Sequence, residues 1–393
     1  MNTKQKLNFS SDYTRSAHPA ILRRLAETAG TSMPGYGTDP VCDSAKDKIR
    51  SACKCPHAEV FFLTGGTQMN ATVIDSILRS YQGVIAADTG HISVHEAGAI
   101  EFGGHKVLTI PATKATAPDD NHRPLANETA APNNTDKTLA NETATPDNMT
   151  QTRPAPGKLR PADLAQYVDT FMNDANHDHM VMPGLVYISQ PTEYGTLYTL
   201  DELTQLSEIC HANALSLYVD GARLAYALAS PANDVTLADL ARLCDAFYIG
   251  GTKCGALFGE ALVIPQQNFI PHFFTIMKQH GALLAKGWLL GLQFDVLFTD
   301  DLYEKIGQTA LNFATEIQDA IEKSGFPLYF KSPTNQLFVV LDDRQRESLE
   351  SEIDMSFWEQ LDENHVVMRI ATSWSTTRED VDALLKILKA ACN

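Results

Sequence analysis

Basic side chains are scarce in this 393-residue chain. It has 31 Lys and Arg against 48 Asp and Glu, which gives a formal net charge of −17. Binding to a nucleic-acid backbone depends on clustered Lys and Arg, so we expect no nucleic-acid partner. The acidic balance by itself identifies no substrate, because net charge affects solubility and association more than chemistry.

Long apolar runs and paired cysteines are also lacking. No apolar stretch is long enough to cross a bilayer, and the polar start of the chain has no apolar segment typical of a secretion signal. We therefore expect no membrane partner and a cytoplasmic location. The seven cysteines are odd in number and scattered, which favours reduced thiols over a disulfide framework. Cys53 and Cys55 lack the second cysteine pair of a zinc ribbon, so we expect no metal.

The remaining composition is that of a large folded protein. With 44% hydrophobic and 20% charged residues, the chain can build a sizeable core and two domains. From residue 58 onward, short β-branched or aromatic runs alternate with helical patterns, which is typical of parallel strands joined by crossover helices. We expect strands at 59–63, 83–87, 106–110, 185–189, 216–219, 246–249 and 260–264. We expect helices at 68–81, 161–172, 200–213 and 237–243. The pattern predicts an α/β fold.

After Pro265 the pattern changes. A long helix is expected at 301–324, then strands at 336–341 and 366–370 and a closing helix at 378–391, which together predict a smaller α+β domain. We therefore divide the chain into an N-terminal arm (1–44), a large domain (45–265) and a small C-terminal domain (266–393). The arm either lies over the active site or makes an oligomer contact.

Residues 112–156 differ from the rest of the large domain. They contain almost no large apolar residues, so they cannot build a core. The sequence Leu-Ala-Asn-Glu-Thr-Ala at 125–130 recurs at 139–144, a step of fourteen residues. We interpret this segment as a tandem-duplicated low-complexity insertion that forms a mobile surface loop.

Two charged residues carry the strongest chemical signal. Lys253 lies in a Gly-Gly-Thr-Lys-Cys-Gly turn after an apolar strand, and Asp220 ends the preceding predicted strand. A lysine amine can form a Schiff base with an aldehyde, and an aspartate can keep a pyridine nitrogen protonated. Either residue alone would be an ordinary loop charge. The ordered pair predicts pyridoxal 5'-phosphate as the cofactor.

Two further motifs follow apolar strands. Thr64-Gly65-Gly66-Thr67 leads from a strand into a helix start, where free backbone N–H groups favour a phosphate. The motif is neither a dinucleotide fingerprint nor a P-loop, and a purely structural turn is the alternative. His91 is placed to stack on a cofactor ring or to transfer a proton, although a capping or surface histidine has the same local sequence.

These pieces, in this order, resemble the threonine aldolases and related β-eliminating lyases of the fold-type-I pyridoxal phosphate superfamily. The resemblance spans nearly the whole chain outside the insertion. The matching stretches lie at 11–15, 36–40, 64–68, 91–98, 220–224, 253 and 367–370. The family's fold is a large domain with a mainly parallel sheet between helices and a smaller C-terminal α+β domain, which agrees with the pattern above.

The resemblance implies six cofactor-binding residues, namely Gly66, Thr67, His91, Asp220, Arg223 and Lys253. Lys253 would hold the cofactor covalently, Asp220 would pair with its pyridine nitrogen, and His91 would stack on its ring. Gly66 and Thr67 would bind the phosphate, and Arg223 would lie near the phenolic oxygen. Lys253, His91 and Asp220 are also the expected catalytic residues.

The resemblance also implies how an amino acid would bind. Ser11 and Arg369 would hold the substrate carboxylate, the latter through its two-pronged guanidinium. Tyr36 would border the substrate, from the same chain or across a subunit interface. The base that takes the substrate's β-hydroxyl proton is His91, His95 or an ordered water, of which we favour His91 or a water beside it.

The implied reaction is cleavage of L-threonine, L-allo-threonine or a related β-hydroxy-α-amino acid to glycine and an aldehyde. A β-eliminating lyase or an aminotransferase-like enzyme with the same cofactor is the alternative, and a non-catalytic cofactor-binding interaction protein is a third. The family further implies a homodimer or homotetramer. The segment at 189–195 replaces a more usual Glu-Asn-Thr type of sequence, which places this chain in a divergent branch.

Overall fold

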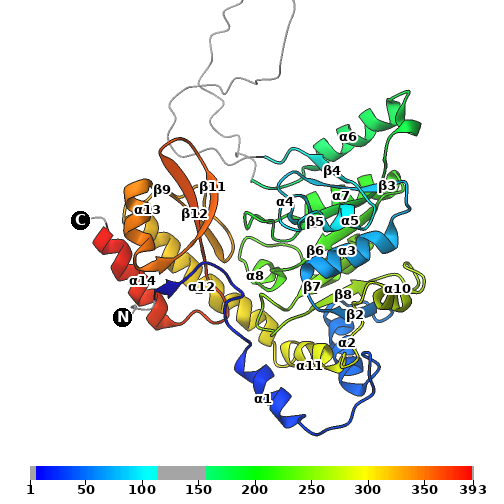
Figure 1. Cartoon of the computed structure of the whole chain (residues 1–393), viewed down its shortest axis with the longest axis horizontal. Coiled ribbons are helices and arrows are strands. Elements are labelled where there is room, and N and C mark those ends of the chain that lie inside the picture. The colour runs from blue at the N-terminus through cyan, green and yellow to red at the C-terminus, as the bar shows by residue number, and fades with distance from the viewer. Residues whose placement is uncertain (1–5, 114–155, 392–393) are drawn as a thin grey trace, which may run out of the picture.

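The computed structural model describes residues 6–113 and 156–391, which form a seven-stranded sheet, a three-stranded sheet and a two-stranded pair with their helices (Figure 1). The repeats and nearly all of the insertion predicted at 112–156 lie outside the described residues, as do residues 1–5 and 392–393. No helix in the described ranges is long and apolar enough to span a membrane.

The larger sheet has seven strands in the order β2-β8-β7-β6-β5-β3-β4. Their bounds are β2 (Glu59–Leu63), β3 (Gln82–Ala87), β4 (Val107–Ile110), β5 (Met182–Ser189), β6 (Ser216–Asp220), β7 (Ala246–Gly250) and β8 (Glu260–Ile264). The sheet is mainly parallel, as predicted, but β8 runs antiparallel to both β2 and β7. Only residues 251–259 connect β7 to β8, which is too short for the crossover that a parallel pair needs.

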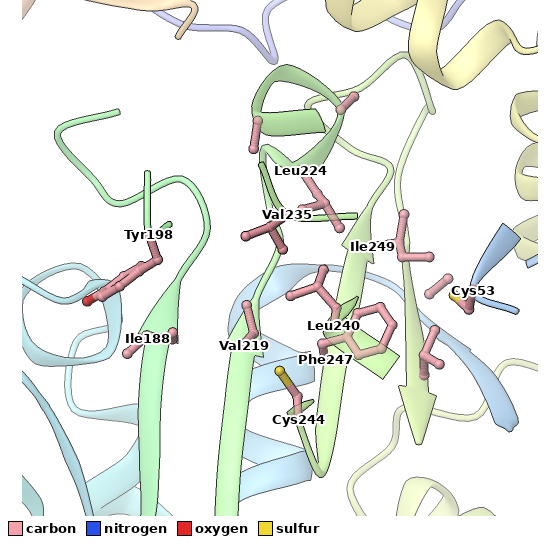
Figure 2. Packing of buried hydrophobic residues seen from close by; sticks show 14 of the residues in the cluster. Cys53, Ile188, Tyr198, Val219, Leu224, Val235, Leu240, Cys244, Phe247 and Ile249 are labelled. Atoms are coloured by element: carbon pink, nitrogen blue, oxygen red, sulfur yellow. The ribbon is translucent and has the colours of Figure 1, made fainter. Parts of the chain in front are cut away.

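Helices cover both faces of this sheet, so its strands are apolar on both sides. One face packs against α3 (Gly66–Ile77) and α10 (Phe273–Gln279), whereas α7 (Leu200–Ala212) and α9 (Leu237–Leu243) lie on the other. The second face also carries α2 (Pro40–Ala52), α6 (Pro161–Asn173) and α11 (Trp288–Leu297). Successive strand residues alternate between the two cores, as the pleat requires. Figure 2 shows part of the second core, where Val219, Phe247 and Leu240 gather.

The smaller sheet has three antiparallel strands in the order β11-β12-β9. Its elements are α12 (Leu302–Lys323), β9 (Gln336–Asp342), α13 (Asp343–Glu350), β11 (Ser356–Gln360), β12 (His365–Ala371) and α14 (Arg378–Ala391). A separate buried cluster lies between the sheet and these helices. The start of the described chain belongs here, because β1 (Leu7–Asn8) pairs in parallel with β10 (Ile353–Asp354).

Several short elements connect these layers. They are α1 (Pro19–Glu27), α4 (His91–Val94), α5 (Ala99–Phe102), a 3-10 turn (His177–His179) and α8 (Leu224–Leu228). Helices α10 and α11 follow the boundary predicted at residue 265, yet α11 packs on α2 and α10 on α3. The division into an arm and two domains stays a prediction.

Candidate active site

The carboxyl ends of five strands meet at one edge of the large sheet. Asp220 is the last residue of β6, Lys253 follows β7, and His91 follows β3. Gly66 follows β2, and Glu193 follows β5 in the same way. In α/β sheets this edge is where ligands bind, because the loops that follow parallel strands converge there.

A cavity of about 570 Å³ lies between this edge and β11 and β12 of the small sheet. Its ionisable lining includes His91, His95, Glu193, Arg223, Lys253 and Arg369. Four of the nine site residues predicted from sequence therefore share one cavity. The aromatic ring of Trp358 lies beside it, with the Arg369 guanidinium 5.4 Å from the ring centroid.

Asp220 is buried at the centre of a hydrogen-bonded network. Its carboxylate accepts from the backbone N of Ala222 at 3.0 Å, Tyr187 Oη at 2.6 Å, Asn70 Nδ2 at 3.0 Å and Tyr248 Oη. Burial alone would raise the pKa of Asp220, but the His91 charge and these side-chain hydrogen bonds outweigh it and lower the pKa. Asp220 therefore stays ionised and can hold a protonated pyridine nitrogen.

Asn70 connects Asp220 to His91. Its Nδ2 donates to Asp220 Oδ2 and, at 2.7 Å, to Glu96 Oε1, and its Oδ1 accepts from Tyr218 Oη at 3.0 Å. The same Glu96 oxygen lies 2.7 Å from His91 Nδ1. Because an ionised carboxylate only accepts, Nδ1 carries the proton, and the imidazole is held in one orientation.

Lys253 is half-buried on the turn after β7 and lines the cavity. A Cβ at Gly250 would collide with the carbonyl oxygen of Ala222, so the lysine turn and the loop after Asp220 can approach only because residue 250 is glycine. Burial, followed by the charge of Arg223, lowers the pKa of the Lys253 amine. A lowered pKa favours the neutral amine, which is the nucleophilic form.

Arg223 forms a buried ion pair with Asp12. Arg223 Nε lies 2.6 Å from Asp12 Oδ2, and Nη2 lies 3.1 Å from Oδ1. Burial opposes ionisation of Asp12, but the charges of Arg223 and Lys253 lower the pKa of its carboxyl to about 2. The pair fixes the N-terminal segment against the loop after β6 and places the Arg223 guanidinium at the cavity.

Arg369 on β12 has spare hydrogen-bonding capacity. Its Nη1 donates to Gln336 Oε1 and its Nη2 to the carbonyl of Ser10, both at 3.1 Å. Burial and then the charge of Arg223 lower its pKa to about 10, so it stays a cation at neutral pH. Within the described chain, neither Arg369 Nε nor the buried Ser11 Oγ has a hydrogen-bond partner. Such atoms fit an anionic ligand, because unpaired buried donors are costly.

The predicted phosphate-binding residues lie at the start of α3. The first backbone bond of this helix runs from Met69 N to Gly65 O at 2.9 Å, so the N–H groups of Gly66 and Thr67 precede it. A Cβ at Gly66 would lie only 3.1 Å from the Tyr248 hydroxyl that donates to Asp220. The start of α3 therefore lies beside Asp220. Neither Gly66 nor Thr67 lines the cavity.

Tyr36 is not brought to this cavity within one chain. It is 42% exposed and borders a separate cavity of about 90 Å³, with Lys278 Nζ 4.5 Å from its ring centroid. A role for Tyr36 at the substrate would need a second copy of the chain, so that role stays a prediction.

Comparison with known proteins shows which family this chain belongs to. A family model described as β-eliminating lyase matches residues 8–344. This chain belongs to the β-eliminating lyase family. A threonine aldolase structure from Leishmania major is similar to this chain, with 39% identity and a TM-score of 0.84 over 98% of this chain and 99% of that one. The low specificity L-threonine aldolase of Pseudomonas aeruginosa is 27% identical over 98% of both chains.

More distant structures confirm the fold-type-I class. Serine palmitoyltransferase from Sphingomonas wittichii has a TM-score of 0.66 at 11% identity, covering 99% of this chain and 88% of that one. Aspartate aminotransferase from Thermus thermophilus, with bound maleate, has a TM-score of 0.65 at 11% identity, covering 98% and 91%. At these identities only the fold is shared. The predicted fold class, with a mainly parallel large sheet and a smaller C-terminal sheet, is correct.

Pyridoxal 5'-phosphate, the cofactor of this family, fits the residues present. An amine of lowered pKa, a buried carboxylate and an imidazole of fixed orientation lie around one cavity edge, supplied by Lys253, Asp220 and His91. The free N–H groups at the start of α3 suit its phosphate. The unpaired Thr89 Oγ1, also at this cavity, is a further donor available to a ligand in the described structure.

Sequence reasoning missed several residues of this site. Asn70, Tyr187 and Tyr248 hold Asp220, and Glu193 lines the cavity. In the sequence, the two tyrosines have the pattern of ordinary core residues. The residues around each one do not indicate that both hydroxyls donate to one carboxylate. Glu193 had a signal that was passed over: it is an acidic residue four positions after a buried strand, within the segment that departs from the family pattern.

Proposed function

We propose that this protein is a pyridoxal phosphate-dependent aldolase that cleaves L-threonine, L-allo-threonine or a related β-hydroxy-α-amino acid to glycine and an aldehyde. The observation that carries the proposal is that Lys253 and the incompletely paired Arg369 line one cavity. Lys253 would hold the cofactor, whose aldehyde an α-amino group can take over, and Arg369 suits the α-carboxylate of the same amino acid. The 39% identical threonine aldolase of Leishmania major supports the β-hydroxy-α-amino acid as substrate.

The proposed roles of the residues are those that the family resemblance implies, and the contacts described above are compatible with them. Lys253 would hold the cofactor covalently, Asp220 would pair with its ring nitrogen, and His91 would lie against the ring face. Gly66 and Thr67 would hold the phosphate, and Arg223 would lie near the phenolic oxygen. When bound, the cofactor supplies an electron sink for the pair left on Cα after a bond to it breaks.

Substrate orientation would depend on the small-sheet side of the cavity. Arg369 and Ser11 would hold the α-carboxylate through atoms that now lack partners. Fixing the carboxylate sets which Cα bond is aligned for cleavage, and such positioning supplies much of the rate enhancement. Arg369 is itself oriented by Gln336 and Ser10.

The two alternatives have weaker support. A β-eliminating lyase or aminotransferase-like enzyme would use the same cofactor residues but break the Cα–H bond, whereas both relatives named above with more than 25% identity are threonine aldolases. A non-catalytic interaction protein would not need Lys253, Asp220, His91 and Arg369 around one cavity.

The test is release of acetaldehyde from L-threonine and from L-allo-threonine by the protein loaded with pyridoxal phosphate. Lys253→Ala is the control and should abolish release. An active wild type with an inactive Lys253→Ala variant supports the proposal. If the cofactor binds but neither threonine isomer, nor a larger β-hydroxy-α-amino acid such as β-phenylserine, is cleaved to glycine, the aldolase proposal is wrong and the lyase alternative takes its place.

We also propose a homodimer or homotetramer in the cytoplasm. The exposed position of Tyr36, away from the cavity of its own chain, supports a site completed by a second copy. The described cysteines are all free, which suits a reducing compartment. Sedimentation equilibrium tests the assembly, since a monomer at micromolar concentration would contradict it.

A further inference from the structure

Glu193 is a buried carboxyl that the mechanism above does not use. It lies on the loop after β5, is 8% exposed, and lines the same cavity as Lys253 and Arg369. A carboxyl in such a place is costly unless its ionised form is supported, so its contacts show what it is built to do.

Two hydrogen bonds to the Glu193 carboxyl, from different residues, end on one oxygen. Ser189 Oγ donates to Oε1 at 2.7 Å, and the backbone N of His91 donates to the same atom at 2.9 Å. These bonds fix the carboxyl plane beside His91. They leave Oε2 as the oxygen available to a molecule in the cavity.

The loop that carries Glu193 is held on both sides. Thr192 N donates to Thr196 O at 2.9 Å, and Thr334 Oγ1 donates to Gly195 O at 2.9 Å. A single side chain also connects Glu193 to the expected carboxylate-binding residue: Gln336 Nε2 donates to the Glu193 carbonyl at 3.4 Å, while Gln336 Oε1 accepts from Arg369. Glu193 is thus preorganised relative to Arg369, as a catalytic group must be.

The two histidines at the cavity are less suited to the task of a base. With Nδ1 bonded to Glu96, only Nε2 of His91 could accept a proton, and the expected stacking would hold the ring flat against the cofactor. Burial lowers the pKa of His95, and the positive charges of His91, Arg369 and Lys253 lower it further. A lowered pKa makes His95 a weaker proton acceptor.

We propose that Glu193, through Oε2, is the base that removes the β-hydroxyl proton of the substrate. The inference rests on the aldolase function proposed above. The proton passes to Glu193, the O–H electron pair forms the carbonyl of the aldehyde, and the Cα–Cβ bond breaks with its pair left on Cα. Cα then takes up a proton that comes from solvent to give glycine, and Glu193 returns its own proton to solvent.

The electrostatics of the site suit this role. Burial, the largest effect, raises the pKa of Glu193; the Ser189 hydrogen bond and the His91 charge oppose it, while Asp220 adds to it. The pKa of Glu193 therefore lies above that of an ordinary carboxyl and nearer to neutral pH. A general base is most effective when its pKa is near the working pH. Ionisable groups near it also include Tyr187, Tyr194 and Tyr198, and the cations of Lys253, Arg223 and Arg369 and the His95 ring line the same cavity.

The main test is Glu193→Gln in the loaded enzyme, with acetaldehyde release as the readout. General-base catalysis contributes about 10²–10⁴-fold, so kcat should fall at least about 100-fold. Binding of pyridoxal phosphate and of glycine, measured by absorbance titration, should stay within about threefold, because glycine has no β-hydroxyl group. Glu208→Gln, on the exposed face of α7, is the matched control and should leave kcat unchanged.

A second variant keeps the proposal testable if Glu193→Gln does not fold. Ser189→Ala removes a hydrogen bond that favours the ionised carboxyl, so the pKa of Glu193 should rise. Because the base must be ionised, kcat/KM rises with pH through this pKa, and its acid limb should move to higher pH in Ser189→Ala. An unmoved limb, or a Glu193→Gln enzyme as active as wild type, would overturn the proposal. An inactive wild type would instead reject the aldolase function itself.

Discussion

The guanidinium of Arg223 binds both carboxylate oxygens of Asp12, with Nε–Oδ2 and Nη2–Oδ1 distances of 2.6 Å and 3.1 Å. Both side chains are nearly removed from solvent, with 11% and 0% exposed. Asn335 Nδ2 donates to Asp12 Oδ2, the oxygen bound by Arg223 Nε, at 3.0 Å. The pair therefore joins the N-terminal segment, the loop after β6 and the small sheet at the edge of the cavity.

Removing one partner of this pair should destabilise the protein strongly. Asp12→Ala leaves the Arg223 charge buried and unpaired, and such a change costs about 3–5 kcal/mol of unfolding free energy. Urea denaturation measures it. The matched control is Asp47→Ala, which breaks the exposed Asp47–Arg50 pair and should cost about 0–1 kcal/mol. Equal losses of unfolding free energy in the two variants would show that the buried pair stabilises the protein no more than the exposed pair does.

The same pair should give stability an acid dependence. The folded-state pKa of Asp12 is lowered from 3.8 to about 2, so its contribution is present above pH 3.8 and is lost as pH falls toward 2. Asp12→Asn cannot titrate at this position. The difference in unfolding free energy between wild type and Asp12→Asn should therefore shrink by about 2 kcal/mol between pH 5 and pH 2. A difference that is constant with pH would contradict the lowered pKa.

Asn70→Ala should weaken cofactor binding. Without the Asn70 amide, the buried carboxylates of Asp220 and Glu96 lose a shared donor, and each such loss costs about 1–3 kcal/mol. The pKa of Asp220 then rises, which weakens its pairing with a ring nitrogen. We expect the dissociation constant of pyridoxal phosphate to rise about tenfold in absorbance titrations of the apo-protein. Asn173→Ala, on the exposed end of α6, should bind the cofactor as wild type does.

Arg369→Lys should impair substrate binding although the charge is kept. The Arg369 guanidinium contacts Gln336 and Ser10 through its two Nη atoms and keeps Nε for a ligand. A lysine amine cannot make all of these contacts at once. A hydrogen bond to a charged group contributes about 1.5–3 kcal/mol, so kcat/KM should fall about 10- to 100-fold. Steady-state kinetics with L-threonine measures the change. Arg378→Lys is the control, because Arg378 makes a two-pronged contact with Glu316 on the surface; a similar fall there would remove the special role of Arg369.

Local patterns located most of the elements around the site. The predicted ranges 59–63, 237–243 and 260–264 coincide with β2, α9 and β8, because apolar runs bounded by turn residues define them. The predicted bounds of α3 were displaced, because this helix begins at a glycine: it runs from Gly66 to Ile77 and not over 68–81. β11 was missed, since its side chains are half-buried or exposed and show no apolar run.

The sequence by itself determined the fold class, the cofactor and the order of Lys253, Asp220 and Arg369 along the chain. Each of these is a property of residue type and local spacing, which the chain carries in any conformation. The tertiary structure alone decided that Asn70 connects Asp220 to Glu96, that Tyr36 lies outside the cavity of its own chain, and that Glu193 lies within it. Such relations join residues far apart in sequence, and they arise only when the carboxyl ends of the strands converge and packing decides which polar atoms are paired.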